Sequence, residues 1–327
     1  MNHRAWPSSL LYVPLNWNQA RRLFRRERAL SDGSPRSVAG SASRAWAVGG
    51  VRAASLCVAS GKGGVGKSVI SASISAYCST RGRTLLIDAD LGMGNAHILQ
   101  GVKPEASLVD FIERGHTIGD IRTPCGEGLD LLAGGSGIPH MAGLQREDRA
   151  RLSEQLAELE VAYKFLVLDS AAGISSQTMS FAAAADRLLL VLTPDVTSMT
   201  DAYGFLKVHN QVRPAGEALF VVNRAVDEEQ AYSTADRFRE VSERFLGVQP
   251  RWLGFLPEDP EVGSSVNRRR PLLLDNPSAP AGKALTGIAA QLFSELECLN
   301  PRGLGRSLSA VGGGEALPPR SSGVRHT

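Results

Sequence analysis

Short apolar runs and longer amphipathic stretches alternate between residues 55 and 299. The apolar runs are nearly continuous and do not alternate with polar residues, which is typical of strands that helices cover on both faces. These runs occupy residues 56–60, 84–90, 129–134, 165–170, 187–193, 218–224 and 251–257. Helical periodicity predicts helices between them, at residues 68–81, 144–162, 198–211 and 231–246. The pattern therefore predicts an α/β fold, a doubly wound and mainly parallel sheet flanked by helices.

The two ends of the chain show other patterns. Residues 15–30 predict a short helix with apolar residues on one face and arginines on the other. Residues 31–50 are rich in Ser, Gly and Ala and predict a flexible linker. Residues 284–300 are interpreted as the last core helix, and the Gly-, Ser- and Pro-rich segment that follows predicts a disordered tail. The chain is thus divided into a basic N-terminal extension at 1–54, a folded domain at 55–299 and a tail at 300–327.

Charge is distributed unevenly along the chain. The sequence has 36 Lys and Arg residues against 33 Asp and Glu residues, a net charge of +3. Residues 1–54 contain nine arginines and two acidic residues, a net charge of +7, so the rest of the chain carries −4. A mildly acidic folded domain disfavours a direct nucleic-acid partner. The Arg- and Ser-rich leader also fits an organellar transit peptide, and the composition leaves that alternative open.

The cysteines and the hydropathy limit the class of protein. Four cysteines are scattered with no C-x-x-C pair, at positions 57, 78, 125 and 298. This spacing argues against a metal ribbon, a disulfide framework and an iron–sulfur carrier, and it fits a reducing compartment. No apolar run approaches the ~20 residues of a membrane span, and the leader lacks the apolar segment of a secretory signal. The cytoplasm is the expected location.

A glycine-rich stretch, GKGGVGKS, follows the first apolar run at residues 61–68. Its spacing satisfies the phosphate-loop pattern, with a strand predicted before it and a helix after it. The backbone of such a loop turns inward around a phosphate, here that of Gly61, Gly63, Gly64, Val65 and Gly66. Lys67 is expected to neutralise the β- and γ-phosphates, and the Ser68 hydroxyl to bind Mg²⁺. The alternative is a glycine-rich turn that binds no ligand.

The loop contains a second lysine, Lys62, that the phosphate-loop pattern does not require. Because Lys67 already serves the phosphates, we expect the Lys62 side chain to point away from the interior of the pocket. From there it could reach a phosphate bound by another subunit. That geometry predicts two chains face to face with nucleotide between them. The alternative is an ordinary solvated lysine.

Three aspartates stand at the ends of predicted strands. Asp88 and Asp90 end the run at 84–90, and at a period of two their side chains point to the same side. Asp169 ends the run at 165–170, the position of a carboxylate that holds Mg²⁺ directly or through water. The carboxyl ends of parallel strands share one edge of the sheet, so these side chains are predicted near the phosphate loop. The alternative is capping of the strand ends by Asp.

The stretch KGGVGKS resembles the deviant Walker A motif of the MinD/ParA family of ATPases, and the resemblance extends over about residues 55–295. It implies an ATPase with ATP and Mg²⁺ as cofactors and Lys62 acting across an ATP-sandwiched homodimer. It also implies that Asp90 orients the attacking water near the metal, and that Asp88 helps to hold the loop or the signature lysine. Asn95 matches the family pattern D-x-G-x-x-N, without an assigned role.

The resemblance also reaches the later strands. The segment after Asp169, SAAGIS, resembles a switch that senses the γ-phosphate. The Asn223 amide is expected at the edge of adenine, with Pro257 and Glu258 near the base. An ordinary turn asparagine is the alternative at position 223. The basic stretch NRRRP at 267–271 is interpreted as a solvated face.

Three segments resemble the branch of the family that regulates flagellar number, called FlhG or FleN. They are residues 194–210 (PDVTSMTDAYGFLKVHN), residues 169–175 (DSAAGIS) and residues 18–24 (NQARRLF). The resemblance implies a switch ATPase for flagellar number or placement. Its implied partners are an FlhF-like GTPase, through residues 18–24, and flagellar basal-body or regulator proteins. The alternative function of residues 15–30 is a basic amphipathic helix that binds a membrane or another partner.

Other functions on the same fold are left open or disfavoured. A MinD-like septum-site ATPase and a ParA-type partition ATPase share the nucleotide chemistry and differ in their partners. A biosynthetic amidoligase would need a further domain for which the chain has no room. Residues 284–300 lack a basic polar face, so any membrane association is expected to be weak and peripheral, at the inner face of the plasma membrane. Hydrolysis is expected to be slow and to depend on the dimer.

Overall fold

The computed structural model describes residues 52–135, 146–214 and 217–313. The predicted helix at 15–30, the linker at 31–50 and the motif at 18–24 lie outside the described residues, as do residues 314–327.

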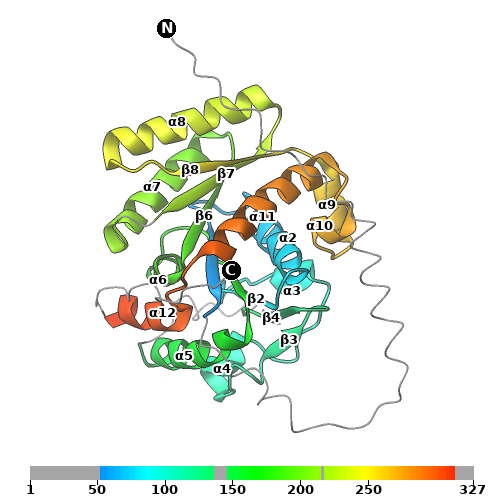
Figure 1. The fold of residues 1–327 in the computed structure, drawn as a ribbon, viewed down its shortest axis with the longest axis vertical. Helices are drawn as coiled ribbons and strands as arrows, with labels where there is room; N and C mark the ends of the chain where they lie inside the picture. Colours follow the sequence, from blue (N-terminus) through cyan, green and yellow to red (C-terminus); the bar gives the residue numbers. More distant parts are fainter. Residues whose placement is uncertain (1–51, 136–145, 215–216, 314–327) are drawn as a thin grey trace. The chain divides into compact units, whose positions relative to one another are not determined.

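The described chain forms one eight-stranded sheet in the order β3-β4-β2-β5-β1-β6-β7-β8 (Figure 1). Every pairing is parallel except that of β3 with β4. The strands are β1 (Ala54–Ala59), β2 (Thr84–Asp88), β3 (Arg122–Pro124), β4 (Leu129–Leu132), β5 (Phe165–Asp169), β6 (Arg187–Leu192), β7 (Ala218–Ala225) and β8 (Arg251–Pro257). The predicted doubly wound, mainly parallel fold is therefore confirmed.

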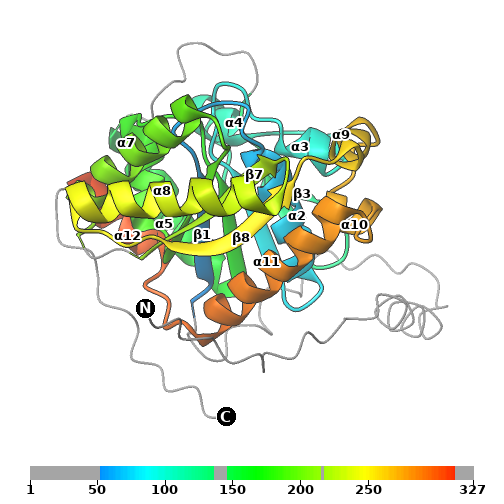
Figure 2. The same cartoon turned by 90° about the horizontal axis from the view of Figure 1, so that it is seen from above.

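Helices cover both faces of the sheet (Figure 2). Their bounds are α2 (Lys67–Ser79), α3 (Ala96–Leu99), α4 (Leu108–Arg114), α5 (Arg146–Leu159), α6 (Ser176–Ala184), α7 (Val196–Val212), α8 (Glu228–Leu246), α9 (Pro260–Asn267), α10 (Leu272–Asp275), α11 (Pro280–Cys298) and α12 (Leu304–Gly313). One buried cluster joins the sheet to α4, α5, α6, α7, α8 and α12, and a second joins it to α2, α3, α10 and α11. The helices thus form two layers with the sheet between them.

Strand β1 shows how one apolar run serves both layers. Its residues are all buried; Cys57 and Ala59 belong to one cluster, whereas Leu56 and Val58 belong to the other. Successive side chains of a strand point to opposite faces, so a strand covered on both sides must be apolar at every position. Burying a Leu or Val side chain fully stabilises the fold by about 1.5–3 kcal/mol. Each polar residue in such a strand would forgo this gain, which explains why the apolar runs are uninterrupted.

The seven predicted strands are confirmed, with ends within two residues of the expected ones. The structure adds β3, whose three residues are exposed or half-buried at the edge of the sheet and therefore carry no apolar pattern. It also adds the helices α3, α4, α6, α9 and α10. Two of them, α3 and α10, have only four residues, too few to show a helical period.

The expected disordered tail from residue 300 is corrected for residues 304–313, which form α12 against α5 and α6. Leu304 and Leu308 are fully buried, one helical turn apart, and give α12 an apolar stripe. Gly305 lets the helix approach closely, because a Cβ there would lie 2.3 Å from the carbonyl oxygen of Ser153. Small residues in this segment therefore allow α12 to pack closely against α5.

A buried carboxylate holds the start of α12. Glu160 accepts hydrogen bonds from the backbone N–H groups of Leu304 and Gly305, at 2.7 and 3.4 Å. Its other oxygen receives the Arg52 guanidinium at 2.6 Å. Burial raises the pKa of Glu160, and the Arg52 contact opposes that rise. A negative charge at a helix N-terminus is favourable, so Glu160 fastens α12 to the domain.

Candidate functional site

The phosphate-loop sequence connects β1 to α2 as the pattern predicts. Gly66 precedes α2 with φ 95°, and a Cβ there would lie 2.3 Å from the Asn223 side-chain nitrogen, so both conformation and space require glycine. Gly61 packs against α7, where a Cβ would lie 2.1 Å from the Asp201 carbonyl oxygen. No side chain caps α2 and its first turn has no acidic residue. Its free N–H groups can therefore receive an anion.

Lys67 is the first residue of α2 and is nearly buried, with 8% of its surface exposed. Burial lowers the pKa of its ammonium group, while the charges of Asp169 and Asp90 oppose this shift. A desolvated ammonium at a helix N-terminus favours a highly charged anion as its partner. This position agrees with the predicted contact to a phosphate.

Two buried carboxylates lie side by side at the ends of β2 and β5. Asp88 and Asp169 are direct neighbours in the strand register, and both are almost fully buried. Burial, and then the charge of Asp169, raises the pKa of Asp88 to about 8. Burial also raises the pKa of Asp169, against hydrogen bonds from Ser68 and Ser71 and the charge of Lys67. The raised pKa values show that the two carboxylates cannot both be charged without a compensating cation, and a divalent cation bound here would supply that charge.

The carboxylate and hydroxyl oxygens at this site suit Mg²⁺, which needs few protein ligands, better than a metal ion whose ligands all come from protein. No group of three His, Cys, Asp or Glu side chains within the described ranges could hold a metal ion. Mg²⁺ is typically bound by one or two carboxylates and completes its shell with phosphate oxygens and water. Carboxylate and hydroxyl oxygens from Asp169 and Ser68 meet that requirement next to Lys67.

Asp90 lies beyond the strand, which corrects the prediction that Asp88 and Asp90 both end it: β2 stops at Asp88. Asp88 accepts hydrogen bonds from the N–H groups of Asp90 (3.2 Å) and Ala96 (3.0 Å). Asp90 accepts from those of Gly92 (3.3 Å) and Met93 (3.0 Å). A turn follows the strand because these carboxylates satisfy its backbone donors. Both aspartates therefore brace the loop at 89–95.

Asn95 ends this loop and precedes α3. Its side-chain amide is exposed and donates to the Met93 carbonyl oxygen at 3.0 Å. The residue thus stabilises the loop. In this structure, Asn95 of the D-x-G-x-x-N pattern contacts the loop itself.

Lys62 makes its contacts at the start of α7. Its Nζ lies 3.1 Å from the Asp195 carboxylate and 2.7 Å from the Thr197 hydroxyl. The side chain is 41% exposed. Asp195 also caps α7 by accepting from the Ser198 N–H, and hydroxyls of Thr193 and Thr197 hold the pKa of Asp195 well below its usual range. The second lysine of the loop is thus held by an ionised carboxylate of its own chain.

Sequence reasoning did not identify Asp195, Thr193 or Thr197 as part of the site. The available signal was the sequence TPDVT at residues 193–197, which ends the run at 187–193. An Asp directly before a helix is a capping pattern, because its carboxylate accepts from an N–H of the first turn, and the carboxyl ends of parallel strands lie at the ligand edge.

Asn223 connects the end of β7 to the phosphate loop. Its amide nitrogen donates to the Val65 carbonyl oxygen at 2.7 Å, and its amide oxygen accepts from the Arg224 N–H at 3.0 Å. Glu258 follows β8 and is ion-paired with Arg224 at 3.0 Å. Pro257, the last residue of β8, pairs with Ala225 of β7. The structure therefore brings all three residues predicted near adenine to the two strand ends beside the loop.

A cavity of about 400 Å³ opens between these elements. Lys62, Val65, Asp195, Arg224 and Glu258 are among the residues that line it. Its position joins the phosphate loop to the ends of β6, β7 and β8. Ligands in doubly wound folds bind at this edge, so the cavity is a candidate part of the nucleotide site, and Lys67, Ser68 and Asp169 lie outside its lining.

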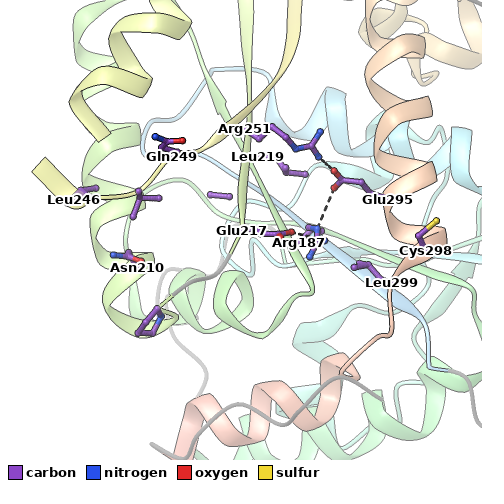
Figure 3. A pocket seen from close by; sticks show the side chains of 14 residues that line it. Arg187, Asn210, Glu217, Leu219, Leu246, Gln249, Arg251, Glu295, Cys298 and Leu299 are labelled. Atoms are coloured by element: carbon purple, nitrogen blue, oxygen red, sulfur yellow. Dashed lines mark hydrogen bonds and ion pairs between the residues drawn. The ribbon is translucent and has the colours of Figure 1, made fainter. Parts of the chain in front are cut away.

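A larger cavity, of about 990 Å³, lies at the opposite edge of the sheet (Figure 3). It is built around Arg187 and Arg251, the first residues of β6 and β8. Glu295 of α11 is ion-paired with both arginines, and Glu217 lies 2.7 Å from Arg187. The cavity is far from the phosphate loop and its charges are paired within the protein. Size alone therefore does not identify the nucleotide site.

The loop, the desolvated lysine at a helix N-terminus and the paired carboxylates on neighbouring strands define a phosphate-loop nucleotide-binding protein of the ATPase class. Comparisons with known proteins agree. The chain belongs to the CobQ/CobB/MinD/ParA nucleotide binding domain family, whose profile matches residues 56–272.

Relatives of known name place the chain within this family. Antiactivator FleN of Pseudomonas aeruginosa is 31% identical over 249 residues, covering 76% of this chain and 89% of that protein. Flagellum site-determining protein YlxH of Helicobacter pylori is 27% identical over 248 residues, covering 74% and 82%. The solved MinD of Pyrococcus horikoshii, complexed with Mg-ADP, has a TM-score of 0.62 at 23% identity and covers 73% of this chain and 96% of its own. The two flagellar relatives favour the FlhG-like branch over the septum-site alternative.

Across the described parts of the chain, no helix is long and apolar enough to cross a bilayer.

Proposed function

We propose that this protein is an ATP-dependent dimerising switch ATPase that regulates flagellar number or placement. The observation that carries the proposal is the position of Lys62. It belongs to the phosphate loop, yet its ammonium group is held at Asp195 and Thr197 on the rim of the site. A half-exposed lysine at this rim can leave its carboxylate for the phosphates of a second subunit.

Exposed apolar side chains around the same edge support a face-to-face dimer. They follow the carboxyl ends of four different strands, β2, β5, β6 and β7: Met93 (73% exposed), Ile174 (55%), Val196 (67%) and Val226 (73%). Large apolar side chains that share one edge mark an interaction surface. A dimer through this edge would cover them and bring each Lys62 toward the partner's nucleotide.

Each site residue has a proposed role. Backbone N–H groups of residues 61–66 and the Lys67 ammonium would hold the phosphates. Ser68, Asp90 and Asp169 would hold Mg²⁺, which would supply positive charge beside the phosphates, and Asp90 would orient the attacking water. Hydrolysis of this kind depends on positioning and charge neutralisation. A site that lacks its second lysine until two chains meet would turn over slowly, which suits a timer.

The flagellar output is inferred from the relatives named FleN and YlxH. An FlhF-like GTPase is the proposed partner, contacted through residues 18–24. Peripheral attachment to the inner face of the plasma membrane is a further proposal. A MinD-like division role would use the same ATPase with another partner.

The dimer is tested with Lys62→Ala and a matched control, Lys283→Ala, which removes an exposed lysine from α11. We expect the wild type with Mg-ATP to have the mass of a dimer by light scattering, and to be a monomer with ADP. Lys62→Ala should stay monomeric and lose about tenfold or more of its ATPase rate, because one charge contact to phosphate is lost. Chelation of Mg²⁺ should return the wild type to a monomer. Normal dimers of Lys62→Ala would overturn the proposal.

The flagellar role is tested separately, with the GTPase rate of the cognate FlhF-like protein. Addition of the full chain should stimulate that rate, and Gln19→Ala or Leu23→Ala should remove the stimulation while leaving ATP-dependent dimers intact. An unchanged GTPase rate would contradict the activator role and leave the ATPase switch standing.

A further inference from the structure

The three arginines of the stretch NRRRP differ in their contacts: one forms ion pairs within the described part of the domain and two do not. Arg268 is ion-paired with Asp275 at 2.5 Å and with Glu261 at 3.1 Å. Arg269 and Arg270 are exposed and have no ion pair within the described residues. The sequence alone does not distinguish the three arginines, whereas the structure leaves two of them available to a partner.

Arg269 also has an unusual backbone. Helix α9 ends with hydrogen bonds from the Arg269 N–H to the Val266 carbonyl (2.9 Å) and from the Arg270 N–H to the Ser265 carbonyl (3.1 Å). This is the Schellman arrangement, in which the residue at the Arg269 position takes a left-handed conformation and is usually glycine. Arg269 has φ 53°. A strained arginine where glycine would fit without strain indicates that its side chain is used for something other than the fold.

The neighbouring elements complete a surface. A Cβ on Gly101 would lie 2.7 Å from the Arg269 carbonyl oxygen, so the chain after α3 is packed against the end of α9. Figures 1 and 2 both show α3 beside α9 and α10. Two residues further on, Lys103 is exposed and has no ion pair in the described structure. We call Lys103, Arg269 and Arg270 the basic patch.

The helices next to the basic patch also expose apolar side chains. Ile98 of α3 and Leu274 of α10 are each 39% exposed. Acidic side chains also lie among these elements, namely Glu105, Glu261 and Asp275, of which Glu261 and Asp275 are paired with Arg268. A lipid surface or a nucleic acid favours a continuous positive face. The mixed pattern of free cations, two paired acids, the exposed Glu105 and apolar side chains fits a folded or helical polypeptide better.

The patch is connected to the nucleotide site through α3. The Asp88 carboxylate accepts a hydrogen bond from the N–H of Ala96, the first residue of α3, at 3.0 Å. The far end of α3 leads to Gly101, which contacts Arg269. A change at Asp88 when nucleotide and metal bind would therefore shift α3 against the patch.

We propose that the basic patch, with Ile98 and Leu274 beside it, is a docking surface for an acidic polypeptide segment that carries apolar side chains. We further propose that docking is linked to nucleotide through α3. The surface itself does not depend on the proposed function, whereas the linkage rests on it.

The surface is tested on the full chain without nucleotide, using the fluorescence anisotropy of a labelled peptide of repeated Glu-Glu-Leu. We expect binding that weakens as salt is raised, since the contacts are between exposed charges. The double variant Arg269→Gly with Arg270→Ala should weaken binding about tenfold. Arg237→Ala, which removes an exposed arginine from α8, is the matched control and should bind as the wild type does.

A separate measurement excludes unfolding as the cause. Arg269→Gly relieves the left-handed strain, so its thermal midpoint should equal or exceed that of the wild type. Lost binding in a variant that is at least as stable would establish a role for the side chain in recognition.

Four outcomes would overturn parts of the proposal. Absence of peptide binding, or equal binding by the double variant, would overturn the docking surface. Patch-dependent binding to vesicles of phosphatidylcholine and phosphatidylglycerol, without binding to the peptide, would assign the patch to a lipid surface. Equal peptide affinity with Mg-ATP and Mg-ADP would overturn the linkage. The mass of the protein in those same samples reports ATP-dependent dimers, so failure of the proposed function is recognised independently.

Discussion

At the scale of single residues, the polar groups around the phosphate loop are already engaged with one another. Asn223 donates to the Val65 carbonyl and accepts from the Arg224 N–H, so both ends of its amide have partners. The residue therefore holds the loop in place with one of its two amide N–H donors and one lone pair of its oxygen. Lys62 is likewise held by Asp195. The candidate nucleotide site is thus a network of groups that are hydrogen-bonded to one another in the single chain.

Asn223→Ala separates the two roles proposed for this residue. We expect it to weaken the binding of ATP and GTP alike, by about tenfold, because one hydrogen bond to the loop is worth about 1 kcal/mol or slightly more. Titration of the full chain with fluorescent ATP and GTP analogues measures both affinities. Asn267→Ala, in an exposed position at the end of α9, serves as the control. A selective loss of ATP over GTP would instead assign Asn223 to base recognition.

At the scale of elements, α12 is part of the folded domain. Its buried residues pack against α5 and α6, and Glu160 holds its first turn. Helix α6 begins at Ser176, directly after the predicted γ-phosphate switch at 170–175. The C-terminal helix therefore supports the element that follows the switch.

Leu308→Ala tests this support. Leu308 is 1% exposed, so its truncation should lower the free energy of unfolding by about 3 kcal/mol, the usual cost of a cavity of that size. Ser309→Ala, in an exposed position on the same helix, should change it by less than about 0.5 kcal/mol. Denaturant unfolding of both variants provides the comparison. Equal stability of the two would show that α12 does not contribute to the fold.

At the scale of the whole domain, the two edges of the sheet are built differently. The carboxyl edge holds the phosphate loop, the paired aspartates and several exposed apolar side chains. The amino edge holds the larger cavity, where Arg187 and Arg251 are paired with glutamates. Within residues 52–135, 146–214 and 217–313, the carboxyl edge thus combines buried carboxylates of raised pKa with exposed apolar side chains, the combination expected of a site that a second subunit completes.

Ile174→Glu places a charge on that edge. We expect it to abolish ATP-dependent dimers while leaving ATP affinity within about twofold, because a charge buried in an interface is costly whereas Ile174 is 55% exposed in the single chain. Light scattering and nucleotide titration measure the two effects. Phe245→Glu is the control: the residue is 64% exposed at the end of α8, beside the larger cavity, and the variant should dimerise normally. Dimers of Ile174→Glu would argue against this interface.

Local sequence patterns were sufficient to predict seven of the strands, the five longest helices and the phosphate loop. These features are local: a strand buried on both faces must be apolar at every position, and a loop around phosphate needs glycines at fixed spacing. Positions such as Gly61, Lys67 and Asp169 could be assigned for that reason. The exposed strand β3 and the four-residue helices carry no such pattern and could not be predicted.

Contacts between groups far apart in the chain could not be predicted from local patterns. Lys62 and Asp195 are 133 residues apart in sequence, and Val65 and Asn223 are 158 apart. The Leu304 N–H donates to the Glu160 carboxylate, 144 residues away in sequence. Residues 304–313 therefore form α12, where the sequence pattern predicted a disordered tail. The three arginines at 268–270 are equivalent in sequence until the fold pairs one of them with Glu261 and Asp275. Charge pairing and burial depend on distance in space, and the sheet order that sets those distances is a property of the whole domain.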